Sequence, residues 1–114
     1  MVQRALAAVD ALGEKGVSVE VVDPRSLLPL DEGLILNSVK KTGRVIIVHE
    51  APTRGGFGAE ISALLADRGI DFRDGPVKRM GGHFCPIPST SAMEQYYLPS
   101  VERIVEAARE ILRF

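Results

Sequence analysis

The chain has 114 residues, of which 46% are apolar and 25% charged, and its formal net charge at pH 7 is −1. This length fits one domain spanning residues 1–114, and the composition suits a packed core with a hydrated surface. Because the chain has no excess of basic residues, we do not expect it to bind nucleic acid or anionic membranes in general.

Cysteine usage and the N-terminal residues narrow the class of protein further. Cys85 is the only cysteine, so an internal disulfide is impossible, and a reducing, cytoplasmic compartment is the simplest interpretation. Residues 1–16 mix apolar and polar side chains at helical spacing instead of carrying the apolar block of a signal peptide. We therefore expect a cytoplasmic protein with no membrane segment.

The first third of the chain predicts a helix, a strand and a second helix. Apolar residues recur at helical spacing over residues 2–12 and are followed by glycines. Residues 17–22 are β-branched and nearly alternating, which predicts a strand. Asp31 is a suitable N-cap for a helix through residue 41, with Gly43 as its end.

The remaining two thirds predict two more strands and two more helices. Residues 45–48 form a continuous apolar run, which is typical of a parallel strand buried on both faces. A glycine-rich turn leads to a third helix that ends at Gly69, and residues 76–80 predict a further strand. Residues 81–99 show little periodicity and predict an irregular crossing, after which Ser100 caps a strongly amphipathic last helix.

This alternation predicts an α/β fold with a mainly parallel sheet and helices on both faces. The order nevertheless opens with a helix, whereas chains of this kind usually open with a strand. We therefore expect the sheet to lack its usual first strand, which would be a central one.

Two neighbouring motifs are candidates for binding or chemistry. His49 and Glu50 follow the most apolar strand, at the sheet edge where parallel sheets bind ligands, so they could form an acid/base pair or simply cap the strand end. Gly56, Phe57 and Gly58 precede a helix and could offer N–H groups to an anion, or form a tight turn that packs helix against strand.

Metal and thiol chemistry receive little support. His49, His83 and Cys85 show no recognised zinc-ligand spacing, and no base is assigned beside Cys85. We expect no metal site.

Three stretches carry a family resemblance. They are VEVVDPRSLLPLD at residues 19–31, VKKTGRVIIVHEAPTRGGFGAEI at residues 39–61, and YLP at residues 97–99. Together they resemble the C-terminal domain of the β subunit of thiamine-dependent 2-oxoacid dehydrogenases, whose fold transketolases share. The form HEAP-x-x-GGF-x-AEI looks most like the branched-chain (2-oxoisovalerate) members, with pyruvate and acetoin enzymes less well matched.

The resemblance implies an assembly domain of an oxidoreductase that is inactive in isolation and has no catalytic or cofactor-binding residue of its own. The family places thiamine diphosphate and Mg²⁺ between a preceding pyrimidine-binding domain and the α subunit. The implied partners are the α subunit, a second β subunit and the subunit-binding domain of the acyltransferase. From this resemblance we expect Asp74 and the carboxylate of Phe114 to dock that domain, which in the family presents arginine and lysine. The alternative is a frayed C-terminus and a solvated acidic residue in a loop.

The chain also departs from the family pattern. The pyrimidine-binding domain and the strand before the first helix are missing, and residues 83–88 differ from the usual segment. There is no Gly-Asp-Gly motif for the cofactor metal, and the only asparagine, Asn37, falls in a predicted helix. A second hypothesis is a free-standing anion- or nucleotide-binding module that uses His49, Glu50 and the glycine turn.

Overall fold

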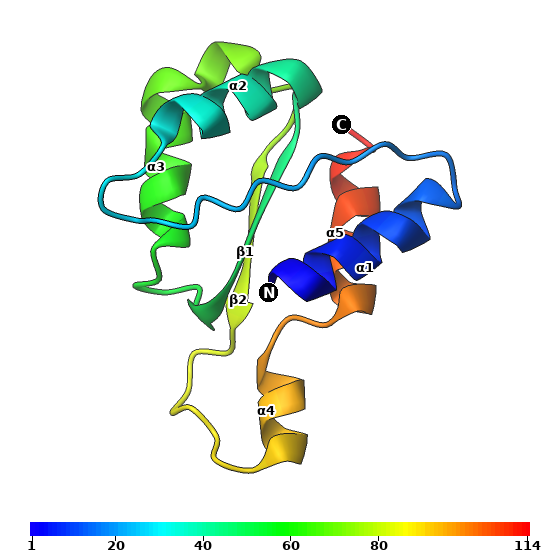
Figure 1. Ribbon diagram of the computed structural model, residues 1–114, viewed down its shortest axis with the longest axis vertical. Helices are drawn as coiled ribbons and strands as arrows, with labels where there is room; N and C mark the ends of the chain where they lie inside the picture. The colour runs from blue at the N-terminus through cyan, green and yellow to red at the C-terminus, as the bar shows by residue number, and fades with distance from the viewer.

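The computed structural model describes residues 1–114, which form five α-helices, one 3-10 helix and two strands (Figure 1). No helix is long and apolar enough to cross a membrane. The elements, in chain order, are α1 Val2–Gly13, α2 Glu32–Thr42, β1 Val45–Pro52, α3 Gly58–Arg68, the 3-10 helix η1 Ile70–Phe72, β2 Val77–Gly82, α4 Ser91–Tyr97 and α5 Val101–Ile111.

The two strands form a parallel sheet, as their apolar sequences predict. Val45 of β1 lies opposite Val77 of β2, and the register continues to Val48 opposite Met80 before an irregularity near Pro52. β1 has no strand partner on its other edge. The predicted strands at 45–48 and 76–80 are therefore confirmed.

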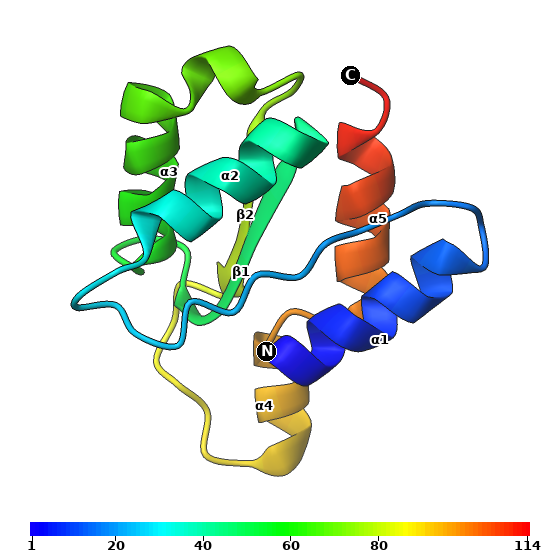
Figure 2. The ribbon, with the colours of Figure 1, turned by 45° about the horizontal axis from the view of Figure 1, so that its top comes forward.

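Helices cover both faces of this sheet, which confirms the predicted α/β class (Figures 1 and 2). Alternate residues of β1 contribute to two separate cores: Ile46 and Val48 pack with α1 and α5, whereas Val45 and Ile47 pack with α2 and α3. The buried members are Ala8, Met80, Ile104 and Ala107 in the first core, and Ile35, Val39, Ile47 and Leu65 in the second.

The helix boundaries follow from local capping. The side chain of Asp31 accepts a hydrogen bond from the backbone N–H of Leu34 at 2.9 Å, and Gly43 ends α2 with a left-handed φ of 72°. Ser100 accepts in the same way from the N–H of Arg103 at 3.2 Å and begins α5. These ends were predicted from the residue types alone.

The predicted strand at residues 17–22 is wrong. The segment crosses over β1 between α1 and α2 (Figures 1 and 2), and residues 18–23 make no hydrogen bond to other main-chain groups. Its β-branched residues favour extended chain, but a strand also requires a partner to pair with.

The prediction of an irregular crossing over residues 81–99 is wrong in part, because α4 lies within it. This helix has only seven residues, and its N-cap Thr90 makes no side-chain capping bond. A helix this short gives too little periodicity to detect among the prolines around it.

Candidate functional site

His49 lies at the carboxyl end of β1, with its ring turned inward rather than toward solvent. Its Nδ1 is 2.8 Å from the carbonyl oxygen of Ala51, so Nδ1 carries the proton and donates in the neutral ring. Nε2 is buried and has no hydrogen-bond partner. The ring is therefore held in one orientation by a bond to its own strand.

Three glycines surround the His49 ring. A Cβ on Gly58 would lie 2.5 Å from Nε2, a Cβ on Gly56 would lie 2.7 Å from Cε1, and a Cβ on Gly81 would lie 2.9 Å from Cε1. Real Cβ atoms do not approach so closely, so only glycine fits at these positions without a shift. The structure thus brings two sequence candidates, His49 and the glycine turn, into direct contact.

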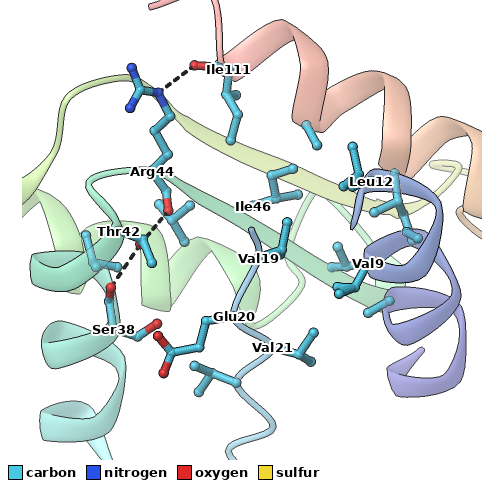
Figure 3. A pocket seen from close by; sticks show the side chains of 18 of the residues that line it. Val9, Leu12, Val19, Glu20, Val21, Ser38, Thr42, Arg44, Ile46 and Ile111 are labelled. Carbon is cyan, nitrogen blue, oxygen red and sulfur yellow. Dashed lines mark hydrogen bonds between the residues drawn. The ribbon is translucent and has the colours of Figure 1, made fainter. Parts of the chain in front are cut away.

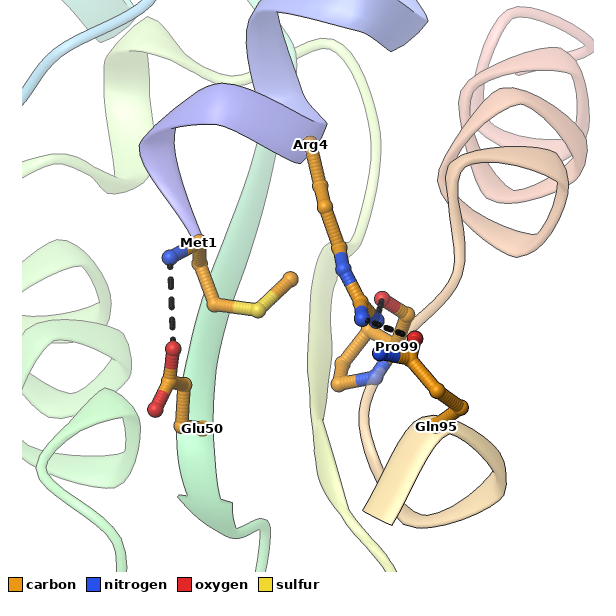
Figure 4. Close-up of polar contacts among 5 residues, drawn as sticks. All are labelled: Met1, Arg4, Glu50, Gln95 and Pro99. Carbon is orange, nitrogen blue, oxygen red and sulfur yellow. Dashed lines mark hydrogen bonds and ion pairs between the residues drawn. The ribbon is translucent and has the colours of Figure 1, made fainter. Parts of the chain in front are cut away.

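Glu50 does not join them. Consecutive residues of a strand point to opposite faces, and the exposed carboxylate of Glu50 lies 3.5 Å from the amino group of Met1 (Figure 4). On the neighbouring turn of α1, Arg4 donates to the carbonyl oxygen of Pro99 at 2.8 Å and to Gln95 at 2.7 Å. His49 and Glu50 therefore do not form an acid/base pair with each other.

The glycine turn begins α3 without a side-chain cap. The N–H of Ala59 donates to the carbonyl of Gly56 and the N–H of Glu60 to that of Phe57, both at 3.0 Å. The N–H groups of Gly56, Phe57 and Gly58 have no main-chain acceptor, but Gly56 and Gly58 are buried against the His49 ring. This contact favours the packing interpretation, and the anion site stays a prediction.

The remaining chemical candidates lie apart from one another. His83 stacks on Tyr96 with ring centroids 5.0 Å apart, and Cys85 is exposed on the segment between them. No three side chains of His, Cys, Asp or Glu come close enough to hold a metal ion. His49, His83 and Cys85 are thus not brought together.

Phe114 and the loop that carries Asp74 lie together at the opposite end of the sheet. A Cβ on Gly75 would lie 3.4 Å from Cβ of Phe114, which places the C-terminus against the loop that carries Asp74. The N–H of Asp74 donates to the carbonyl of Gly43 at 2.7 Å, and Arg44 donates to Phe114 and, at 3.0 Å, to Ile111. Both Asp74 and Phe114 are exposed.

Two close contacts near His49 were not predicted from the sequence. Gly81 of β2 touches the His49 ring, and the next residue, Gly82, packs against the ring of Tyr97, whose buried hydroxyl has no hydrogen-bond partner. The Gly81-Gly82 pair at the end of a predicted strand was the available signal, because glycine in a strand marks close approach of another group.

A parallel sheet with helices on both faces, whose His49 ring is enclosed by glycines at the end of β1, defines an α/β domain. The chain belongs to the transketolase C-terminal domain family, whose model matches residues 1–104. A solved structure described as split gene transketolase, inactive beta4 tetramer, is similar over 97% of this chain and 35% of that one, with a TM-score of 0.80 and 27% identity.

The similar curated proteins are β subunits. The chain is 44% identical to the acetoin:2,6-dichlorophenolindophenol oxidoreductase subunit beta of Bacillus subtilis, over 97% of this chain and 32% of that one. It is 40% identical to the 2-oxoisovalerate dehydrogenase subunit beta 2 of Arabidopsis thaliana, over 95% and 29% respectively. It is also 40% identical to the pyruvate dehydrogenase E1 component subunit beta of Staphylococcus epidermidis, over 100% and 35%. The chain therefore spans about a third of the length of these relatives, and the identities do not single out the branched-chain members.

Proposed function

We propose that the chain is the C-terminal domain of the β subunit of a 2-oxoacid dehydrogenase and serves assembly rather than chemistry. The observation that carries this proposal is that β subunits named for acetoin, 2-oxoisovalerate and pyruvate all match nearly the whole of this chain with about a third of their own length. A region shared by enzymes of different substrates is suited to a structural task, whereas substrate choice resides elsewhere.

The donor set of the chain does not fit the cofactor that the family uses. Thiamine diphosphate is held through a metal ion, and no three acidic, histidine or cysteine side chains gather here. Asn37, the only asparagine, is exposed on α2. We assign no step through thiamine diphosphate to these residues.

The proposed partners are an α subunit, a second β subunit and the subunit-binding domain of an acyltransferase. Exposed apolar side chains on the segment between β2 and α5 offer a contact surface for another subunit; they are Phe84, Ile87, Met93 and Tyr96. At the other end of the sheet, the C-terminal residue Phe114 lies against the loop that carries Asp74, and we assign these two carboxylates to a basic docking partner.

We further propose a branched-chain 2-oxoacid as substrate of the whole enzyme, supported by the HEAP-x-x-GGF-x-AEI form at residues 49–61. Pyruvate and acetoin enzymes are the alternatives, with equal or higher identity.

A domain exchange tests the assembly role. The matching third of the Bacillus subtilis β subunit is replaced by this chain, and the product is co-expressed with its α subunit. We expect a complex of the parental mass by light scattering and the parental substrate preference. A β subunit that lacks this third is the control and should not assemble. Failure of the exchanged β subunit to assemble, although folded, would refute the proposal.

A further inference from the structure

Two grooves of the domain are lined mainly by apolar side chains, and they differ in the charges beside them. The groove at the free edge of β1 measures about 370 Å³, and Figure 3 shows Val19 and Ile46 among the residues around it. Its charged side chains are each bonded within the chain, in the pairs Glu20 with Lys41, Asp23 with Arg25, and Arg44 with Ile111. This groove therefore has no free charge that would select a partner.

The second groove lies between the loop at residues 27–30 and α3 (Figures 1 and 2). Its volume is about 460 Å³, and six of its nine lining residues are hydrophobic. On the loop, Leu27 is 52% exposed and Leu28 is 94% exposed. Phe57 and Leu64, seven positions apart and hence on one face of α3, line the opposite wall. Contiguous exposed apolar side chains around a hollow are typical of a protein contact surface.

Every charged side chain that lines this second groove is acidic. Glu32 pairs with Arg68, whereas Glu60 and Asp67 are exposed on α3 and make no ion pair. Glu60 and Asp67 are also seven positions apart, so both carboxylates lie on the groove side of the helix. Three acidic residues thus line one groove of a chain whose net charge is only −1, which favours a cationic partner.

We propose that this groove binds a basic amphipathic helix of another polypeptide. Its apolar face would lie on Leu28 and Leu64, and its lysine or arginine residues would lie beside Glu60 and Asp67. This contact surface goes beyond the proposed function, because it includes neither the Asp74 loop nor the exposed segment between β2 and α5.

A helix fits this groove better than an extended strand. One wall is α3, whose main-chain groups bond within the helix, and the other is a loop that contains Pro29, which has no N–H. A strand laid between these walls would leave its own N–H and C=O groups without partners, whereas a helix satisfies them internally. Seven residues of α3 span about 10 Å, so a partner of about two turns covers the groove.

The charges also argue against two other occupants. A second copy of this chain that offered the same face would bring two sets of three carboxylates together, and like charges across an interface are unfavourable. The surface of an anionic membrane would meet the same repulsion.

The test uses the isotope-labelled chain and a synthetic peptide of about fourteen residues, with leucine at helical spacing and lysine elsewhere. At low salt we expect saturable changes in the amide signals of residues 27–30 and of α3. The matched control is the same peptide with glutamate in place of lysine. It should bind at least about tenfold more weakly, and this difference should shrink in high salt.

Charge reversal in the chain locates the binding site. The double variant Glu60→Lys with Asp67→Lys should reverse the preference, so that the glutamate peptide binds more tightly. Asp10→Lys with Glu14→Lys makes the same change in net charge at two exposed acidic residues away from the groove, and the lysine peptide should remain preferred. Circular dichroism checks that both variants are folded. If the first variant unfolds, the signal changes and the salt dependence of the unmodified chain decide the question.

Leu28→Ser tests the apolar part of the contact. Leu28 is so exposed that its loss should not unfold the chain, but it should weaken binding of the lysine peptide about tenfold, because a leucine side chain is no longer buried in the complex.

Several outcomes would overturn the proposal. They are equal affinity for the two peptides at low salt, signal changes centred outside residues 27–30 and α3, and loss of the preference in the Asp10 and Glu14 variant as well. Light scattering that shows a dimer abolished by Leu28→Ser would assign the groove to a second copy instead. Binding to phosphatidylserine vesicles that Leu28→Ser abolishes would assign it to a membrane surface.

Discussion

At the scale of single residues, the His49 ring packs closely against the glycines around it. The ring bonds to its own strand through Nδ1, and its other edge meets Gly58 at the start of α3. The turn thus sets how closely α3 approaches β1. Glycine is required here by the neighbouring side chain and not by backbone torsion, because Gly58 has no positive φ.

Gly58→Ala should lower the free energy of unfolding by about 1–3 kcal/mol, because its Cβ would overlap the imidazole. Urea unfolding measures the change. Gly13→Ala is the matched control: nothing lies within 4 Å of its Cβ, and alanine at this helical position should be neutral or stabilising by up to about 1 kcal/mol. In a His49→Ala background the cost of Gly58→Ala should largely disappear. A Gly58→Ala protein as stable as the parent would refute the assigned contact.

The docking residues give a second prediction at this scale. Deleting Phe114, or changing Asp74→Ala, in the intact dehydrogenase should weaken binding of the subunit-binding domain by about 2–5 kcal/mol if the paired charges are desolvated. Titration calorimetry at low and high salt measures this, with Asp10→Ala on the exposed side of α1 as the control. If both docking variants bind like the parent at low salt, where charges are least screened, the assignment is wrong.

At the scale of elements, α5 is defined by its cap and by one ion pair. Ser100 accepts from the N–H of Arg103, and Glu110 in the last turn accepts from Lys78 of β2 at 2.5 Å. The hydrogen bond and the charge of Lys78 hold the pKa of Glu110 below its usual range. One end of the helix is thus fixed by a local bond and the other by a tertiary one.

Ser100→Ala should cost about 1 kcal/mol, because the first turn of α5 loses its side-chain acceptor. Thr90→Ala provides the comparison, since Thr90 occupies the same position before α4 but makes no capping bond. It should change stability by a few tenths of a kcal/mol at most. Equal losses in thermal unfolding for the two variants would contradict the capping role of Ser100.

The ion pair predicts a pH dependence. A carboxyl group whose pKa is lowered on folding stabilises the protein above its unfolded pKa of about 4.3, and this contribution disappears as the pH falls through the folded pKa. Glu110→Gln should therefore be slightly less stable than the parent at pH 7, and the two unfolding curves should converge below the folded pKa. A difference that persists unchanged in acid would exclude Lys78 as its cause. Both side chains are partly exposed, so the effect should shrink in high salt.

At the scale of the whole molecule, the two-stranded sheet divides the domain into two small cores. One core holds α1 and α5 and the other holds α2 and α3, and their only shared element is the sheet. The glycine turn and the docking candidates lie at opposite ends of that sheet. Neither end gathers a set of groups able to hold a metal-bound diphosphate.

The chain alone should therefore show no specific binding of thiamine diphosphate with magnesium in titration calorimetry. The physical reason is the missing set of oxygen ligands, which hard cations such as Mg²⁺ require. An intact 2-oxoacid dehydrogenase serves as the positive control for the titration. Micromolar affinity for thiamine diphosphate, about −8 kcal/mol, would contradict the assembly proposal.

The sequence by itself determined the helix ends, the two paired strands and the α/β class. Asp31, Gly43 and Ser100 end or begin helices through backbone groups only a few residues away. The apolar run at residues 45–48 predicts a buried strand without information from the rest of the chain. The resemblance in residues 19–61 also led to the family. Information of this kind is local, so a single sequence carries it.

The tertiary structure alone decided the pairing of strands and the surroundings of His49. Residues 17–22 have the composition of a strand but no partner, because strand pairing depends on residues far away in the sequence. Gly81 reaches His49 from the neighbouring strand, and Arg44 reaches the C-terminus from 70 positions away. Contacts of this kind arise only when separate elements pack, because no periodicity or capping residue records which distant atoms will meet.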